Sequence, residues 1–451
     1  MVRSKGSWAL FANERDTIFA PASGVGRAAI AVIRVSGPSV FEALKAVAPG
    51  AEFPDRHAVL RTLRHPRSGD LLDRALVTRF AAPRSFTGEE MAELGVTGGR
   101  AVIKAILKAL ALIPGLRPAE PGEFAWRAFS NGKINLCEVE GLADLVEAET
   151  EAQRRQAERI AGGALSRECQ AIRADLVKAM AIVEAQIDFS DVEDADEITS
   201  ESVRAAIRAA LKRIDRALAS AEAGERLREG YNVVIAGPPN VGKSTLMNVL
   251  AGREVAITSP FAGTTRDPIE VFLDLRGYPV TLVDTAGVRE SADPIEREGV
   301  ARALRRAENA DLTLWLDDGT FDQTPAACGP TFFVRTKIDE WRDGFASDPK
   351  ERFAISAKTG AGVDALLDAI ADFAEERMSS RESAVLTFER HRRAFQDARQ
   401  ALFSALELQD PLQELIAEDL RLAAAAMDRV TGRIGVEEVL GEIFSRLCVG
   451  K

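Results

Sequence analysis

Cysteine and long apolar runs are both scarce in this sequence of 451 residues. Its four cysteines are scattered and form no Cys-x-x-Cys pair, which argues against a disulfide framework or a zinc site and favours a reducing, cytoplasmic compartment. No run approaches the ~18 apolar residues that a membrane-spanning helix needs, and the apolar stretch near the N-terminus is too short for a signal peptide. We therefore expect a cytoplasmic protein with no membrane span.

Basic residues are in the minority. The chain has 58 Lys and Arg against 69 Asp and Glu, a net charge of −11. An acidic chain is not a general nucleic-acid binder, so any contact with RNA must come from a local basic patch or from a partner. The length predicts about three domains, and 46% hydrophobic residues fit a globular protein with sizeable cores.

A phosphate-binding loop lies in the middle of the chain. Residues 237–244 read Gly-Pro-Pro-Asn-Val-Gly-Lys-Ser, which fits G-x-x-x-x-G-K-[ST], between a predicted strand at 231–236 and a predicted helix at 244–250. The glycines let successive backbone N–H groups point at a phosphate chain. Lys243 supplies a charge to the outer phosphates, and the hydroxyl of Ser244 holds Mg²⁺.

Two more motifs complete the phosphate side of the predicted site. The strand at 280–284 runs into Asp284-Thr285-Ala286-Gly287, in which the Asp reaches Mg²⁺ through water and the Gly N–H meets the γ-phosphate. The polar loop 263–267, Gly-Thr-Thr-Arg-Asp, is placed to give Mg²⁺ a threonine hydroxyl. Val288 follows the second motif where many GTPases have Gln, so another group must hold the attacking water.

The residues that we expect to contact the nucleotide base predict guanine. The strand at 332–335 ends in Thr336-Lys337-Ile338-Asp339, and Asp339 accepts both N–H groups of the guanine edge, a pair that adenine lacks. Thr336 stands where this motif usually has Asn, but its hydroxyl can still tie the segment to the phosphate loop. Ser356-Ala357-Lys358 closes the pocket after a predicted strand at 352–355. The predicted nucleotide-binding residues are Asn240, Val241, Gly242, Lys243, Ser244, Thr245, Thr264, Thr265, Asp284, Thr285, Ala286, Gly287, Thr336, Lys337, Asp339, Ser356, Ala357 and Lys358.

The remaining segments predict a multidomain α/β protein. Apolar periodicity predicts an α+β N-terminal domain at 16–118, an all-α domain made of 119–229 and 377–451, and a P-loop GTPase domain of the Ras-like class inserted at 230–376. In the first domain we expect strands at 28–35, 75–80 and 93–96 and helices at 38–47 and 100–112. Long helical stretches are expected at 136–176, 207–227, 389–408 and 412–427.

Several motifs together resemble the MnmE (TrmE) family of tRNA-modification GTPases over about residues 16–451. They are Gly24 to Gly37 (GVGRAAIAVIRVSG), Ser-Phe-Thr-Gly-Glu-Glu at 85–90, Pro-Gly-Glu-Phe at 121–124 with Arg-Ala-Phe at 127–129, Ala-Gly-Thr-Thr-Arg-Asp at 262–267, and Cys-Val-Gly-Lys at 448–451. The phosphate loop by itself is generic, whereas this ordered combination is specific.

The resemblance implies a function in tRNA modification. Members act with a flavoprotein partner, MnmG (GidA), in a heterotetramer or larger complex, and add an aminomethyl or carboxymethylaminomethyl group to C5 of the wobble uridine of certain tRNAs. GTP is the substrate, Mg²⁺ and K⁺ are bound, a tetrahydrofolate derivative supplies one carbon, and FAD and NADH act through the partner. The domain at 16–118 is expected to bind the folate and to form a homodimer.

The resemblance also implies roles for individual residues. Glu296 orients the catalytic water, with Lys243 and Arg266 as further catalytic residues. The expected Mg²⁺ ligands are Ser244 and Thr265, and the expected K⁺ ligands are Asn240, Ser259, Phe261 and Thr264. K⁺ is physically reasonable because no arginine finger is evident, although charge develops on the phosphates in the transition state. The implied folate-binding residues are Arg34, Glu90, Arg127, Lys133 and Lys451. Cys448 either touches the one-carbon chemistry or packs as a small apolar group.

The residues of the guanine site also leave a second class of protein open. A regulatory GTPase that binds a protein or the ribosome, with no modification chemistry, would carry the same guanine site. Folate binding separates the two, because a regulator should ignore folate. An ATP-dependent nucleic-acid motor is disfavoured by Asp339 and by the acidic charge.

The replacement of Gln by Val288 generates a prediction. Glu296→Ala should keep GTP binding and lose most hydrolysis, because no other expected group positions the attacking water. Single-turnover hydrolysis with pre-bound GTP measures this step directly. An unchanged single-turnover rate would remove Glu296 from the mechanism.

Overall fold

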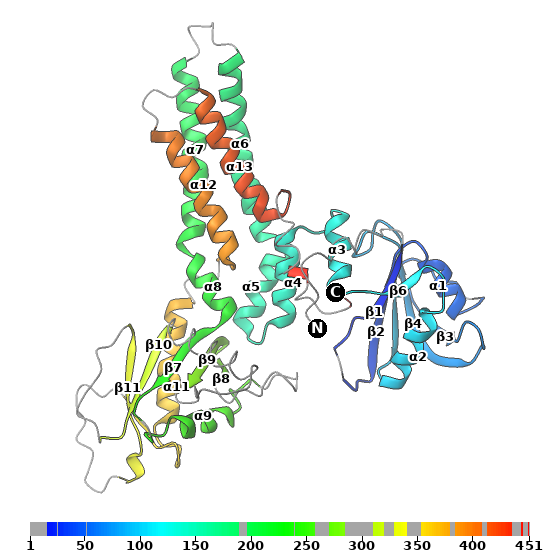
Figure 1. Cartoon of the computed structure of the whole chain (residues 1–451), viewed down its shortest axis with the longest axis horizontal. Coiled ribbons are helices and arrows are strands. Elements are labelled where there is room, and N and C mark those ends of the chain that lie inside the picture. Colours follow the sequence, from blue (N-terminus) through cyan, green and yellow to red (C-terminus); the bar gives the residue numbers. More distant parts are fainter. Residues whose placement is uncertain are drawn as a thin grey trace, which may run out of the picture. The chain divides into compact units, whose positions relative to one another are not determined.

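A computed structural model divides the chain into two compact units, residues 1–143 with 428–451 and residues 144–427 (Figure 1). We describe each unit by itself. The described residues are 16–24, 26–50, 52–188, 196–238, 240–257, 270–284, 310–319, 329–340, 353–378, 384–407, 413–434, 443, 444 and 450, with the side chains of 188 and 196–200 excluded. Among the described helices, none is both long enough and apolar enough to cross a membrane.

The first unit contains a six-stranded sheet in the order β3-β4-β5-β2-β1-β6. All neighbouring strands are antiparallel except β1 and β6, which run parallel. The strands are β1 (Thr17–Pro21), β2 (Ile30–Ser36), β3 (Ala58–Arg64), β4 (Leu71–Phe80), β5 (Met91–Thr97) and β6 (Leu116–Pro118). The three strands expected from sequence are confirmed as β2, β4 and β5, whereas β1, β3 and β6 were not predicted.

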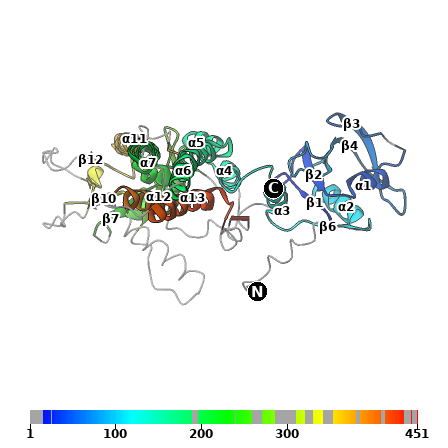
Figure 2. The same ribbon diagram turned by 90° about the horizontal axis from the view of Figure 1, so that it is seen from above.

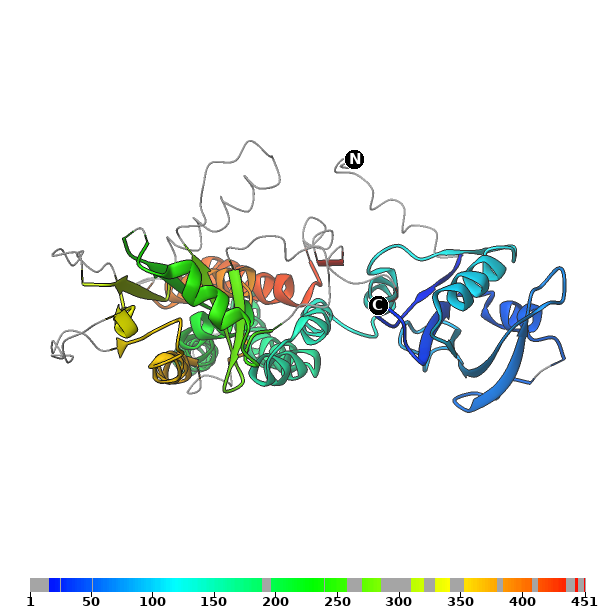
Figure 3. The same cartoon turned by 90° about the horizontal axis from the view of Figure 1, so that it is seen from below.

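Two helices cover one face of this sheet. Helix α1 (Val40–Val47) and helix α2 (Arg100–Leu110) bury Leu44, Ile106 and Leu110 in one core with alternate residues of the strands. Figure 3 shows these blue and cyan helices beside the strands. Both helices were predicted, and the α+β character of this part is therefore confirmed.

The opposite face of the sheet carries exposed apolar side chains. Leu60 pairs with Leu76 across β3 and β4, and both are at least half exposed, at 62% and 50%. Ile30 on β2 is 64% exposed and lies on the same face, because Leu76 is aligned with Gly95 and Gly95 with Val32. We call Ile30, Leu60 and Leu76 the open-face patch.

The predicted helical stretches are confirmed. The helices are α3 (Glu123–Ser130), α4 (Leu136–Glu147), α5 (Glu151–Ala161), α6 (Ala164–Asp188), α7 (Asp196–Ala219), α8 (Ala221–Glu229), α12 (Glu389–Glu407) and α13 (Gln413–Thr431). In the second unit α7 packs against both α6 and α12, and Figure 2 shows these helices grouped and seen nearly end-on. Thr150 and Gln153 form a capping box that fixes the start of α5.

The rest of the second unit is an open sheet in the order β12-β11-β10-β7-β9-β8. Its strands are parallel except β8, which runs antiparallel to β9. The elements are β7 (Tyr231–Ala236), α9 (Lys243–Ala251), β8 (Glu270–Leu275), β9 (Tyr278–Asp284), β10 (Leu312–Asp317), β11 (Thr331–Arg335), a 3-10 turn (Ile338–Glu340), β12 (Phe353–Ala354) and α11 (Val363–Met378). This is the predicted P-loop GTPase fold of the Ras-like class, although β8 was not predicted.

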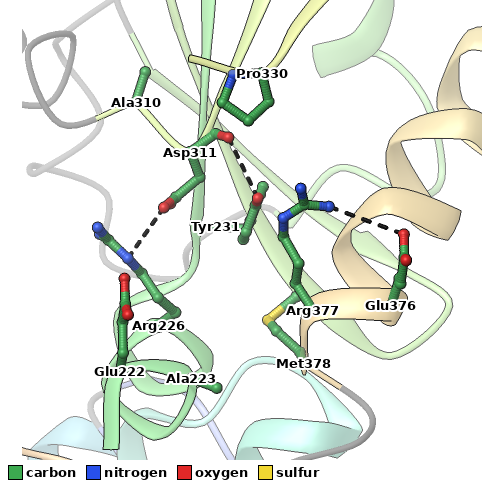
Figure 4. A pocket seen from close by; sticks show the side chains of 10 residues that line it. All are labelled: Glu222, Ala223, Arg226, Tyr231, Ala310, Asp311, Pro330, Glu376, Arg377 and Met378. Atoms are coloured by element: carbon green, nitrogen blue, oxygen red, sulfur yellow. Dashed lines mark hydrogen bonds and ion pairs between the residues drawn. The ribbon is translucent and has the colours of Figure 1, made fainter.

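A cavity of about 550 Å³ lies where α8 passes into the sheet (Figure 4). Arg226 of α8 pairs with Asp311 at 3.0 Å, and the Tyr231 hydroxyl donates to the Asp311 carbonyl at 3.3 Å. Burial raises the pKa of Asp311, against the lowering effects of the Asn232 N–H and the Arg226 charge. Tyr231 begins β7 and Pro330 precedes β11, so the cavity opens at the edge where the parallel strands start. These contacts join the helices to the sheet at that edge.

Candidate functional site

The phosphate loop connects β7 to α9. Gly237 has a φ of +145°, and a Cβ there would lie 2.3 Å from the carbonyl oxygen of Leu316 on β10. Gly242 has a φ of +103° and immediately precedes α9. Both positions therefore require glycine, one for close approach to a neighbouring strand and one for a left-handed turn. Asn240 also has a left-handed φ, +63°.

The two polar side chains that begin α9 point to the phosphate side of the site. The ammonium group of Lys243 donates to the carbonyls of Gly237 and Pro238, at 2.8 and 2.7 Å, and the residue is only 7% exposed. Ser244 Oγ donates to the Asp284 carboxylate at 3.0 Å. The structure thus brings together Ser244 and Asp284, which the sequence predicts at Mg²⁺. A hydroxyl and a carboxylate are the oxygen donors that a hard cation takes, so these residues fit Mg²⁺.

A hydrogen bond joins the base side to the phosphate loop. Thr336 follows β11, is 4% exposed and donates through Oγ1 to the Val241 carbonyl at 2.7 Å. The expected contact between Thr336 and the phosphate loop is therefore confirmed. Lys337 has a φ of +57° and pairs with Asp318 at 2.8 Å, which anchors the segment to the end of β10. Sequence reasoning missed Asp318, because only the fold shows which strand end lies beside the base motif.

Asp339, the predicted acceptor for the base, is ionised at neutral pH. A hydrogen bond from Ser356 lowers the pKa of Asp339, with smaller lowering effects from its own backbone N–H and from the charge of Lys358, and burial opposes them. Ser356 is fully buried, so it fixes the carboxylate from inside the domain. An ionised carboxylate accepts two N–H donors, which suits a guanine edge.

Several predicted residues lie outside the described residues, and their roles stay predictions. They are Ser259, Phe261, Thr264, Thr265, Arg266, Thr285, Ala286, Gly287 and Glu296 of the GTPase domain, together with Cys448 and Lys451.

In the first unit, Arg34 meets the C-terminal segment. Its guanidinium group pairs with Glu93 at 2.9 Å, donates to the Gly450 carbonyl at 3.2 Å, and lies 5.3 Å from the Phe86 ring centre. Gly450 has a φ of +107°, and a Cβ there would lie 2.0 Å from the carbonyl oxygen of Pro21. Gly450 therefore packs directly on the sheet beside Arg34.

The segment 83–90 organises the other predicted folate residues. Glu90 pairs with Arg79 at 2.9 Å, Lys133 donates to the Pro83 carbonyl at 2.9 Å, and Arg127 pairs with Glu89 at 3.1 Å. Glu90 belongs to the segment, whereas Lys133 and Arg127 contact it at two other residues, Pro83 and Glu89. The Ser-Phe-Thr-Gly-Glu-Glu motif was the sequence signal for this segment, but Glu89 and Arg79 themselves were missed.

A buried ion network supports that segment. Glu123, 1% exposed, pairs with Arg117 at 2.6 Å and with Arg127 at 3.1 Å. Burial raises the pKa of Glu123, but hydrogen bonds from Arg117 and the Glu120 N–H, with the two guanidinium charges, outweigh it and hold the pKa below its usual range. Because Arg127 also holds Glu89, this network links α3 to the motif at 85–90.

The open sheet, the glycine-dependent phosphate loop and the ionised Asp339 define a P-loop nucleotide-binding protein of the Ras-like class.

Two family models match the chain, "MnmE helical domain" over 136–448 and "GTP-binding protein TrmE N-terminus" over 17–133. A protein of Beijerinckia indica named "tRNA modification GTPase MnmE" is 50% identical over 441 residues, covering 97% of this chain and 96% of that protein. A protein of Methylobacterium sp. (strain 4-46) with the same name is 52% identical over 440 residues, covering 97% and 100%. The chain belongs to the MnmE (TrmE) family.

The link between Thr336 and Val241 generates a prediction. Thr336→Val keeps the side-chain shape but leaves the buried Val241 carbonyl without this donor, a loss of about 1–2 kcal/mol. GDP affinity, measured by titration with a fluorescent analogue, should fall by about 5- to 30-fold.

Thr331→Val is the matched control. Its hydroxyl also donates to a carbonyl, that of Gly329 at 3.2 Å, but Thr331 lies at the start of β11, away from the nucleotide edge. Equal affinities for the two variants would show that the Thr336 contact does not support binding.

Proposed function

We propose that this protein hydrolyses GTP as part of tRNA modification. Together with a flavoprotein partner of the MnmG (GidA) type, it adds an aminomethyl or carboxymethylaminomethyl group to C5 of the wobble uridine of certain tRNAs. The observation that carries the proposal is the combination in one chain of a guanine-type nucleotide site and a TrmE-type N-terminal part. Its relatives at about half identity are named for tRNA modification.

Hydrolysis follows from the positions of a few side chains. Lys243 lies at the mouth of the loop, where its charge meets the outer phosphates, and the N-terminus of α9 adds backbone N–H donors. Mg²⁺, when bound, neutralises charge that builds between the β- and γ-phosphates. Ser244 and Asp284 would hold it, and Glu296 would orient the attacking water.

A potassium ion takes the place of an arginine finger in this proposal. Asn240, Ser259, Phe261 and Thr264 are the residues that would hold it. The left-handed backbone of Asn240 supports this role, because a strained residue in a phosphate loop is often functional.

GTP turnover in KCl and in NaCl tests the cation. At equal ionic strength and with Mg²⁺ present, turnover should be at least tenfold faster in KCl, since a cation at the phosphates supplies part of what a finger gives, about 10³–10⁵ in other GTPases. Asn240→Ala should reduce this selectivity. Equal rates of the unaltered protein in both salts would remove the cation from the mechanism.

A tetrahydrofolate derivative binds beside Arg34. The Arg34 guanidinium, the Glu93 carboxylate and the partly exposed ring of Phe86 offer charge, hydrogen bonds and flat apolar surface, which suit a pterin with a carboxylate tail. Binding is measured by isothermal titration with 5-formyltetrahydrofolate. A chain that hydrolyses GTP but ignores folate would instead be a regulatory GTPase.

The homodimer forms through the open-face patch. Leu60, Leu76 and Ile30 expose apolar surface on one sheet face, and such a patch is typical of a protein interface. Arg34 and Glu93 lie on the same face by strand alternation. The proposed dimer surface and folate site are therefore neighbours.

Leu60→Asp with Leu76→Asp tests the dimer. Two carboxylates in an apolar interface should convert the dimer to a monomer, because burying unpaired charge is costly. Light scattering after size exclusion gives the mass. Val177→Asp, at an exposed apolar site on α6, is the control and should stay dimeric. A monomeric unaltered protein would refute the proposed interface.

A further inference from the structure

The net charge of the chain is divided unevenly. Residues 17–133, which match the TrmE N-terminus, contain 16 Lys and Arg against 10 Asp and Glu, a net charge of +6. The remaining residues contain 42 Lys and Arg against 59 Asp and Glu, a net charge of −17. A basic part within an acidic chain is a feature of proteins that contact a polyanion at one place.

Helix α2 concentrates part of this positive charge. Arg100, Lys104 and Lys108 are spaced four residues apart, so they lie in one row along the helix. The row is about 12 Å long. All three are exposed, and no acidic residue occurs in the helix. We call these residues the α2 row.

Several exposed arginines on other helices of this chain have an acidic partner on their own helix. Arg154 on α5, Arg208 on α7 and Arg393 on α12 each pair with a glutamate of the same helix. Within the described part of the chain, no side chain of the α2 row forms an ion pair or a hydrogen bond. Like charges at this spacing disfavour the helix, so a row without counter-charges is not explained by helix stability.

The surroundings of α2 favour RNA over a lipid surface. A basic amphipathic helix that binds membranes inserts its apolar face. The apolar face of α2 is already used, because Ile106 and Leu110 are buried in the core against the sheet. Only the charged row is left for a partner, which suits the phosphate backbone of a nucleic acid.

The position of α2 is compatible with the proposed dimer. The helix covers the face of the sheet opposite the open-face patch. A second copy seated on that patch therefore leaves the α2 row accessible.

We infer that the α2 row is a phosphate-backbone contact for tRNA. This inference rests on the proposed function and extends it by naming the surface of this chain that the RNA touches. Contacts of this kind position an RNA without reading its sequence, so the row guides tRNA of any sequence.

The test removes the three charges from the full chain. Arg100→Gln, Lys104→Gln and Lys108→Gln are combined, since glutamine keeps helix propensity. Binding of fluorescently labelled unmodified tRNA is followed by anisotropy at several KCl concentrations. The affinity should fall at least tenfold at low salt, and the slope of log affinity against log salt should decrease by about 2–3.

A matched triple variant on α7 controls for the overall loss of charge. Arg208→Gln, Lys212→Gln and Arg216→Gln remove the same charge at the same spacing from exposed positions of α7. This variant should bind tRNA within about twofold of the unaltered chain. An equal loss in both variants, no loss in the α2 variant, or no tRNA binding by the unaltered chain alone would each overturn the inference.

Two further readouts separate this inference from the proposed function. GTP turnover should be the same in all three proteins. Modification of tRNA by the unaltered chain with its flavoprotein partner tests the proposed function, and if it occurs while the α2 variant binds tRNA normally, only the inference fails. Binding of the α2 row to anionic phosphatidylserine vesicles in preference to tRNA would also overturn it.

Discussion

The arrangement of the second unit depends on the direction of its strands. Strands β7, β9, β10 and β11 are parallel, so the polypeptide leaves all of them at the same edge. That edge collects the phosphate loop, Asp284 and Thr336 from three segments that lie between residues 237 and 336. The hydrogen bond from Thr336 to Val241 then joins the phosphate loop to the segment that follows β11. The opposite edge receives the helices, through the pair of Arg226 and Asp311. Nucleotide contacts and attachment to the helices are thereby kept at different edges of one sheet.

The parts that sequence reasoning predicted well are those with strong local signals. The phosphate loop has a fixed spacing, and the strand before it is a continuous apolar run, so β7 was predicted with the bounds that the structure has. Three of the missed strands lack such signals. Strand β3 is an edge strand with mostly exposed residues, β6 has three residues and ends in Pro118, and β8 shows no clear alternation of buried and exposed residues. Their existence depends on neighbouring strands.

The candidate sites show the same division between local and long-range information. Asp284, Thr336 and Asp339 were predicted because each belongs to a short motif at a strand end. The partners of Arg34 and Arg127 were not, because Glu93 and Glu89 meet them only through strand register and helix packing. Sequence periodicity gives the face on which a residue lies, but it does not give the residue opposite it on another strand. The ion partners therefore required the structure.

The hydrogen bond from Arg34 to the Gly450 carbonyl can form only after nearly the whole chain has been synthesised. The two residues are separated by 416 positions, and the helical and GTPase segments lie between them in the chain. On the ribosome, the sheet of the first unit can form early. Gly450 can pack beside Arg34 only after all of those segments have emerged. The glycine fits because a Cβ would collide with the backbone of Pro21. This corner of the sheet is thus assembled in two stages, and a chain halted within the inserted domain would carry a folded N-terminal sheet with its Arg34 side left open to solvent.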